Sequence, residues 1–568
     1  MATLKHHWSA LVLALCIGAC TVAPFVFFTT DHAYRGVVMM GADAEEHYVA
    51  RIQQVYAGYP ALSNTFLPTK GQPYAIPGLG EIMVAAVGHV THMDAASVSV
   101  FSKFLFPFII ALLIYILAYT LFKSRGAALL GTAAAMLGDN LLSGLSPWLA
   151  ILHGSSEASG FLTFARPINP EVSAVFLFGA LLVLYRGFFE RAVPRTWEVV
   201  VVGVVTGASW YISPYAFTFL GMTIALLWIW SLLRRDHAFS MRTFATGAIA
   251  LACLSPFVIN YLHLHASPWY AALAMRQGVV HTHAPLLSVW LILLLGAVVF
   301  AWPKRYVASR PFFIIATLAL WILTEQQVVT GLSLQPGHYH WYVTKPLIGL
   351  IVGMYAAYVA DRFLRRESLR VFAVGAVLTV LFYNAALVQT SSYLAAYDTA
   401  RAAQNYMPVL TYLNTRPHEE TVWADPTLSL YIPIYTEHNA PNNDYSLFYL
   451  NPQSFYEDRL FLNYRLAGLS PDTALQTFTK DRAAISLRLF GIYYRDAEGS
   501  YAAIPNSILS TLAQKYQTFY SRPVQDVFRE LGITMLVVDD GTSTSTYAVI
   551  PNARLSTALP GFTVYDVQ

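Results

Sequence analysis

The sequence predicts a polytopic α-helical membrane protein with a smaller α/β domain at its C-terminal end. Of the 568 residues, 56% are hydrophobic and only 12% are charged, whereas a soluble globular chain has about 25% charged residues. Apolar runs of membrane length occur up to residue 390, and none follows. The formal net charge of +3 is too small to suggest a nucleic-acid partner.

Eleven apolar stretches are long enough for membrane helices, although the third and the fifth are short. They cover residues 8–28, 98–122, 126–143, 170–189, 197–213, 214–233, 243–262, 285–302, 311–328, 346–363 and 370–390. The fifth and sixth are divided at Pro214, because proline disfavours helical backbone in the residue before it. The first stretch resembles a secretory signal, but we expect an uncleaved, unlipidated helix.

The positive charges predict how these helices are oriented. Lys and Arg are frequent at the N-terminus and in alternate connections, and they are sparse in the opposite loops. Because cytoplasmic loops carry the excess of Lys and Arg, we place the N-terminus in the cytoplasm. An odd number of spans then places the chain after residue 390 outside. We therefore expect a multi-pass protein of the cytoplasmic membrane.

The chain divides into two predicted domains. Residues 1–390 form the transmembrane domain, whose first outer loop is 29–97 and contains an amphipathic helix. Residues 391–568, where polar residues and Tyr become frequent, form a soluble extracytoplasmic α/β domain. Within it we predict strands at 421–425 and 533–539 and helices at 454–466, 472–489 and 524–531.

The most informative segment follows the first predicted span and is rich in acids. A helix beginning near Asp43 would place Asp43, Glu46 and His47 on one face. We expect this helix to lie along the membrane surface, with the acids facing water and the opposite face on lipid or protein. Such acids could also do no more than stabilise the positive N-terminal end of the helix.

An acceptor hydroxyl becomes a good nucleophile when a carboxylate takes its proton, and glycosyl transfer needs such a base. Asp43 is the predicted catalytic base, and Asp31, nearer the membrane, is a second candidate acid. Glu45, Glu46 and His47 are candidates for supporting the acid, contacting the acceptor or binding a metal. A divalent cation, Mg²⁺ or Mn²⁺, is an option, but the spacing is not diagnostic and no other cofactor is predicted.

The acid near the start of the first outer loop, followed by an amphipathic helix, resembles the GT-C superfamily of glycosyltransferases. The motif match is confined to about residues 31–60, where Asp43-Ala-Glu-Glu-His-Tyr48 stands at the place of an Asp shortly before a Tyr or His. The similarity in architecture covers the whole chain. The resemblance implies a polyprenyl-phosphate-linked sugar as donor. The absence of a Trp-Trp-Asp motif disfavours the oligosaccharyltransferase branch.

A lipid-phosphate donor requires cations to stabilise the phosphate as it leaves. Three predicted outer loops offer basic or histidine side chains, which could instead extend to lipid headgroups or, for the histidine pairs, bind a metal. The candidate phosphate-binding residues are Arg166, Arg276, His281, His283, His338, His340 and Lys345.

These observations favour a membrane glycosyltransferase that moves a sugar from a polyprenyl-phosphate donor to a glycan, lipid or protein acceptor at the outer face of the cytoplasmic membrane. A polysaccharide or lipid transporter or flippase is the first alternative, but the chain has no internal repeat and its polar clusters lie at outer helix ends. A membrane sensor or scaffold with a ligand-binding outer domain is the second alternative.

Overall fold

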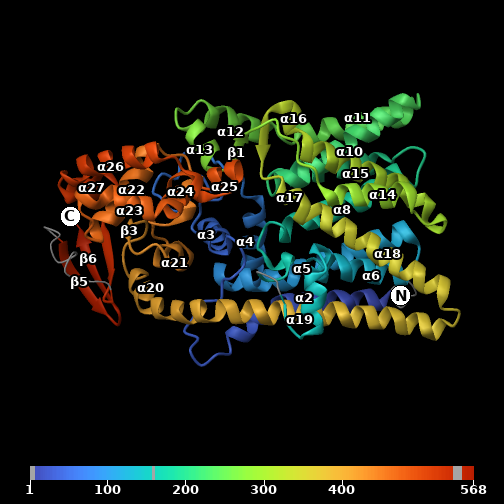
Figure 1. The fold of residues 1–568 in the computed structure, drawn as a ribbon, viewed down its shortest axis with the longest axis horizontal. Coiled ribbons are helices and arrows are strands. Elements are labelled where there is room, and N and C mark those ends of the chain that lie inside the picture. The colour runs from blue at the N-terminus through green and yellow to red at the C-terminus, as the bar shows by residue number, and fades with distance from the viewer. Residues whose placement is uncertain (1–6, 157–159, 542–552, 568) are drawn as a thin grey trace.

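A computed structural model describes residues 7–156, 160–541 and 553–567. The molecule is elongated, with a helical bundle at one end and the C-terminal domain with its sheet at the other (Figure 1). Helix α19 (Glu367–Ala403) runs along one edge of the bundle toward that domain. Its 37 residues span about 55 Å, which exceeds the thickness of a bilayer core. It continues through residue 390, the predicted domain boundary.

Among the described residues, seven helical segments are long and apolar enough to cross a membrane. They are α2 (Trp8–Phe28), α5 (Ala95–Phe122), α8 (Glu171–Phe188), α10 (Pro214–Leu233) and the stretches Lys304–Thr330, Gly337–Phe363 and Glu367–Leu413. The pair α11 (His237–Ala252) and α12 (Ser255–His265), bent by 46°, makes an eighth if it is one span. The chain is therefore a multi-pass membrane protein.

The other three predicted spans are also helical, but they are short. They are α6 (Arg125–Leu137), α9 (Thr196–Ser209) and α14 (Val289–Phe300). A helix of 13 residues such as α6 measures only about 20 Å, whereas a bilayer core measures about 30 Å. A further apolar helix, α4 (Leu79–Thr91), lies in the first outer loop and was not predicted.

Small residues set the closest helix packing of the bundle. Helix α18 (Lys345–Phe363) crosses α6 where Gly353 meets Gly131 and Gly349 meets Ala135. A Cβ atom on Gly353 would lie only 2.2 Å from the backbone nitrogen of Gly131. Such small residues allow two membrane helices to approach backbone to backbone. This contact fixes α18, and the turn that leads into it carries Tyr342 of the site described below.

Short elements connect the long helices of the bundle. They are α7 (Ser146–Leu152), α13 (Tyr270–Arg276), β1 (Val279–His281), α16 (Gln327–Thr330), β2 (Leu332–Leu334) and α17 (Gly337–Tyr339). Strands β1 and β2 pair antiparallel, with Val280 opposite Ser333. A π-helical turn at His340–Thr344 leads from α17 into α18.

The C-terminal domain is built around a four-stranded sheet of order β3-β4-β6-β5. Its strands are β3 (Val422–Trp423), β4 (Met535–Asp539), β5 (Ala553–Leu559) and β6 (Phe562–Val567). Strands β3 and β4 pair parallel, with Val422 opposite Met535, and the other pairs are antiparallel. Both predicted strands and the α/β class are confirmed, while β5 and β6 were not predicted.

Helices surround this sheet. They are α20 (Met407–Leu413), α21 (Leu428–Tyr435), α22 (Gln453–Leu466), α23 (Ala474–Lys480), α24 (Arg482–Phe490), α25 (Tyr493–Glu498), α26 (Asn506–Tyr520) and α27 (Val524–Glu530). The predicted helices at 454–466 and 524–531 are confirmed as α22 and α27. The predicted helix at 472–489 is two helices, α23 and α24, with a break at Asp481.

The acidic helix of the first outer loop does not lie exposed on the surface. Helix α3 (Glu45–Tyr56) packs against α4 and α5 on one side and against α21 of the C-terminal domain on the other. Glu45 is fully buried and His47 is only 5% exposed. Of the face that we predicted to look to water, His47 is covered by the C-terminal domain, whereas the Asp43 side chain is 83% exposed.

Candidate functional site

The candidate site centres on an ion pair between the first outer loop and the segment before α8. The Arg166 Nη2 atom lies 3.1 Å from the Asp43 Oδ2 atom, and Arg166 Nε donates to the Asp43 carbonyl at 2.9 Å. The Asp43 side chain is 83% exposed, whereas that of Arg166 is 15% exposed. A buried guanidinium therefore holds an accessible carboxylate.

Arg166 is also held from its other edge. Its Nη1 atom donates to the Asn169 carbonyl at 2.9 Å and to the Tyr342 hydroxyl. Its guanidinium carbon lies 5.5 Å from the Tyr48 ring centre and 6.0 Å from that of Tyr342. The neighbouring carboxylate and phenols raise the pKa of Arg166 despite burial, so the group stays charged.

Histidine and tyrosine rings extend this site toward the membrane helices. The His338 ring stacks on the Tyr215 ring at 4.5 Å and lies 5.2 Å from the Tyr342 ring. The structure thus brings together Asp43, Arg166 and, through Tyr342, His338. Sequence reasoning missed Tyr48 and Tyr342, and the only signal for Tyr342 was the density of aromatic and basic residues around it.

Glu45 shapes the loop that carries Asp43. Its Oε2 atom accepts hydrogen bonds from the backbone amides of Gly41 and Ala42, each at 3.0 Å. Its Oε1 atom forms an ion pair with Lys103 of α5 at 2.5 Å, and both residues are fully buried. Glu45 is therefore a structural anchor for the turn before Asp43.

Glu46 differs from both neighbouring acids. Burial, together with the charges of Glu45 and Asp43, raises the pKa of Glu46 to about 7. Among the described residues, no cation forms an ion pair with it. A half-buried carboxyl that changes charge near neutral pH is the type of group that general acid–base catalysis uses.

His47 points toward the C-terminal domain. Its Nε2 atom lies 3.0 Å from the Tyr449 hydroxyl, and its ring stacks on Tyr445 at 5.1 Å. Burial and the positive charges of Arg51 and Arg166 lower the pKa of His47 well below its usual value. His47 is therefore neutral at physiological pH and helps to join the two parts of the chain.

The structure places the other candidates in separate environments. Lys345 lies 3.3 Å from Asp139 and 3.0 Å from the Ser143 hydroxyl, with its ammonium 3.6 Å from the centre of the Trp341 ring. His340 lies against the Trp341 ring at 5.5 Å. These contacts put both residues near the C-terminal end of α6 and the N-terminal end of α18.

The remaining candidates also lie outside the Asp43–Arg166 pair. Arg276 is fully buried against the C-terminal domain, where it donates to backbone carbonyls. His281 is exposed on β1, and the Nδ1 atom of His283 contacts the Val328 carbonyl at 3.1 Å. Asp31 accepts from the Ala33 amide at 2.7 Å and the Tyr397 hydroxyl at 2.8 Å. These hydrogen bonds lower its pKa.

In the described ranges, no three His, Cys, Asp or Glu side chains come together in an arrangement that could hold a metal ion. Asp43 contacts Arg166, whereas His47 contacts Tyr449, so the two side chains have different neighbours. The arrangement offers a base and an anion-binding guanidinium side by side.

Three solved structures are similar to this chain over its full length or nearly so. ArnT from Cupriavidus metallidurans in the apo state gives a TM-score of 0.48 at 13% identity, covering 100% of this chain and 99% of that chain. The same protein bound to undecaprenyl phosphate gives 0.45 at 13% identity, covering 100% and 98%. The archaeal oligosaccharyltransferase AglB from Archaeoglobus fulgidus, in complex with an inhibitory peptide and a dolichol-phosphate, gives 0.47 at 12% identity, covering 100% and 75%.

No family model matches the sequence, and no curated protein matches it either.

Proposed function

We propose that this chain is a membrane glycosyltransferase that moves a sugar from a polyprenyl-phosphate donor to an acceptor hydroxyl. The observation that carries the proposal is the 3.1 Å pairing of Asp43 with Arg166. One partner is an accessible carboxylate that can take a proton, and the other is a fixed guanidinium that can bind a phosphate. Both lie where membrane helices meet the C-terminal domain.

The chemistry follows from these two groups. The acceptor oxygen attacks the anomeric carbon of the donor sugar, and its proton passes to the Asp43 carboxylate. The bond between that carbon and the phosphate oxygen breaks, and the phosphate leaves with the electron pair. The N–H groups of Arg166 face the charge that develops on the leaving phosphate, which lowers the barrier.

Arg166 also couples donor binding to the strength of the base. In the free protein its positive charge is paired with Asp43. An arriving phosphate shares the same guanidinium, so the carboxylate loses part of its stabilisation and becomes a better proton acceptor. The planar fork of an arginine can contact two anionic groups at once.

We infer that the site faces the outer side of the cytoplasmic membrane, with the N-terminus cytoplasmic and the C-terminal domain outside. The charge distribution along the sequence supports this orientation. A phosphatase fused after the last residue, which is active only outside the cytoplasm, should be active in intact cells. An inactive fusion with normal expression would reverse the orientation.

The proposal is tested with the full chain in liposomes, supplied with radiolabelled polyprenyl-phosphate sugars and candidate glycan, lipid and peptide acceptors. In this assay Arg166→Lys should lower transfer about a hundredfold and raise the donor KM, because an ammonium cannot reproduce the forked contacts. Arg401→Lys, on the exposed last turn of α19, is the matched control and should stay within about twofold of wild type.

A wild-type chain that transfers no sugar with any donor would remove the proposal. Equal losses of transfer activity in the Arg166 and Arg401 variants would show that activity does not depend on the pairing of Arg166 with Asp43, and would contradict the role given to Arg166.

The pKa of Glu46 predicts how activity depends on pH. Glu46 gains its negative charge as the pH rises through about 7, and this charge beside Asp43 makes Asp43 a stronger base. We expect kcat/KM to rise across this range in wild type, and Glu46→Gln to remove the rise near pH 7. Transfer rates measured from pH 5 to pH 9 check this, and an unchanged profile in Glu46→Gln would contradict it.

A further inference from the structure

The loop between α21 and α22 reaches from the C-terminal domain into the candidate site. We call residues 441–451 the clamped loop. The rings of Tyr445 and Phe448 lie 5.1 and 5.9 Å from the His47 ring. The Tyr449 hydroxyl lies 3.0 Å from His47 Nε2 and donates to the Thr65 hydroxyl at 2.7 Å. The clamped loop therefore forms one wall beside α3.

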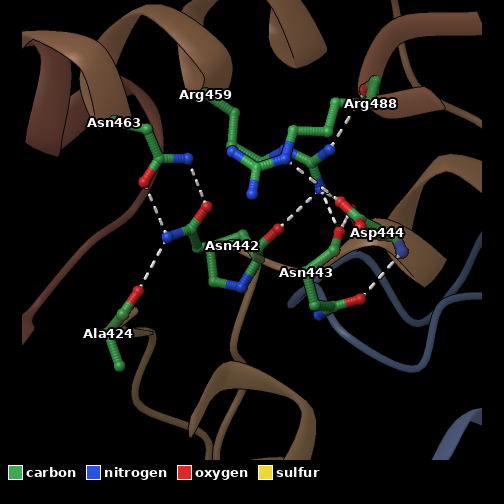
Figure 2. Close-up of polar contacts among 9 residues, drawn as sticks. Ala424, Asn442, Asn443, Asp444, Arg459, Asn463 and Arg488 are labelled. Carbon is green, nitrogen blue, oxygen red and sulfur yellow. Dashed lines mark hydrogen bonds and ion pairs between the residues drawn. The ribbon is translucent and has the colours of Figure 1, made fainter. Parts of the chain in front are cut away.

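A buried arginine of the C-terminal domain holds one end of the clamped loop. Arg459 of α22 donates to the carbonyls of Pro441 at 2.9 Å and Asn443 at 2.5 Å, and to the Ser446 hydroxyl. Figure 2 shows the Arg459 guanidinium directed at the backbone around Asn443. Burial lowers the pKa of Arg459 to about 10, so the group remains charged at neutral pH.

Two asparagine side chains also hold the Arg459 end of the clamped loop. Asn442 and Asn463 exchange hydrogen bonds between their side chains, at 2.8 and 2.5 Å. Asn442 also donates to the Ala424 carbonyl at 2.7 Å, which ties the loop to the segment after β3 (Figure 2). The backbone of the loop is thus fixed to two elements of its own domain.

A second arginine, from the membrane part, holds the other end. Arg276, at the end of α13, donates to the carbonyls of Leu447 at 3.0 Å, Asn451 at 3.3 Å and Tyr449 at 3.4 Å. The Tyr456 ring lies 4.3 Å from the Arg276 guanidinium and 5.4 Å from that of Arg459. Arg276 and Arg459 therefore both bind the backbone of the clamped loop and both lie near the ring of Tyr456.

Burying two arginines costs more free energy than a loop that only joins α21 to α22 would require. In the described part of the chain, neither arginine lies within ion-pair distance of a carboxylate, although both are buried. The nearby charge of Asp444 offsets part of the burial of Arg459, whereas the described hydrogen bonds of Arg276 all go to neutral groups. A buried cation without an anionic partner carries a large desolvation penalty.

The two cations fix the backbone that carries Tyr445 and Phe448, whose side chains stay partly exposed next to His47. Tyr445 also lies near Asp43 and Glu46. Precise positioning of partly exposed side chains is typical of a ligand-binding wall.

We propose that the clamped loop is the acceptor side of the site, and that Tyr445 and Phe448 stack against a sugar ring of a saccharide acceptor. This inference rests on the proposed glycosyl transfer and narrows its acceptor to a glycan. The negative face of an aromatic ring attracts the weakly positive C–H groups on one face of a sugar. The loop belongs to the C-terminal domain, whereas Arg166, Tyr342 and His338 come from the membrane part, where a lipid-linked donor enters.

The sugar of the donor could stack on the same two rings, so kinetic measurements must distinguish it from a sugar of the acceptor. In the liposome assay with a glycan acceptor, Tyr445→Ala and Phe448→Ala should each raise the acceptor KM about tenfold. The donor KM should stay within about twofold. Tyr520→Ala removes an exposed ring on α26 away from the site and is the control. A rise in donor KM alone, or no change in either KM, would overturn the assignment.

A binding measurement separates this inference from the proposed function. Saturation-transfer NMR of the full chain in detergent, with soluble arabinan, galactan, mannan and glucan fragments, should detect binding of at least one. That binding should persist in Tyr520→Ala and be lost in Tyr445→Ala and Phe448→Ala. Absence of binding by every fragment, or binding that survives both aromatic substitutions, would overturn the inference. Aromatic-dependent binding in a chain without transfer activity would instead remove the glycosyltransferase proposal.

Discussion

Replacing Asp43 by asparagine is expected to lower sugar transfer about a thousandfold, which is within the range that a general base contributes. Asparagine keeps the size of the side chain but cannot accept the proton of the acceptor hydroxyl. It also weakens the charged contact with Arg166. Single-turnover transfer with saturating donor measures the chemical step directly, and donor binding should persist.

The control for this substitution is Asp31→Asn in the same outer loop. The Asp31 carboxylate accepts hydrogen bonds from the Ala33 amide and the Tyr397 hydroxyl, away from Arg166. Its replacement should leave the single-turnover rate within about twofold of wild type. A large loss in Asp31→Asn together with an active Asp43→Asn would exchange the roles of the two acids.

Replacing Lys103 by methionine is expected to destabilise the folded chain by about 3–5 kcal/mol, because it leaves the buried Glu45 carboxylate without its partner. Thermal or denaturant unfolding in detergent measures this loss. The double variant with Glu45→Gln should recover much of it, since no unpaired charge remains. Its transfer rate should still be low, because Glu45 holds the amides of Gly41 and Ala42 before Asp43.

An exposed ion pair provides the matched control for the buried one. Lys123 pairs with Glu190 at 2.7 Å, with its side chain 65% exposed. Because solvent-exposed pairs contribute about 0–1 kcal/mol, Lys123→Met should change the free energy of unfolding by no more than that. Equal destabilisation by the Lys103 and Lys123 substitutions would show that burial of the Glu45 pair is not what stabilises the fold.

Much of the fold could be predicted because its signals are local. Every predicted apolar stretch is helical, and strands β3 and β4 lie where short apolar runs predicted them. Hydrophobic composition does not determine where a helix ends. The lengths of α6, α9 and α14 were therefore overestimated from the sequence. Strands β5 and β6 were missed because polar residues interrupt their apolar pattern, as in Arg554-Leu-Ser-Thr-Ala558.

The site was less predictable because tertiary contacts decide the role of each charge. Asp43 and Arg166 were both candidates, and the structure brings them together across 123 positions of sequence. Lys103 was missed because a single lysine in an apolar helix gives no sign of its partner. Arg276 looked like a free outer cation, but its donors face the backbone of a loop that follows far along the chain. The covering of α3 by α21 likewise depends on how two domains meet.

The most direct test of the central claim is a structure of the full chain with a non-transferable polyprenyl-phosphate-sugar analogue. The account predicts the phosphate within hydrogen-bond distance of the Arg166 guanidinium, with the anomeric carbon of the sugar turned toward Asp43. A phosphate bound instead at His281 and His283, or at Lys345, with Asp43 facing away from the sugar, would contradict it.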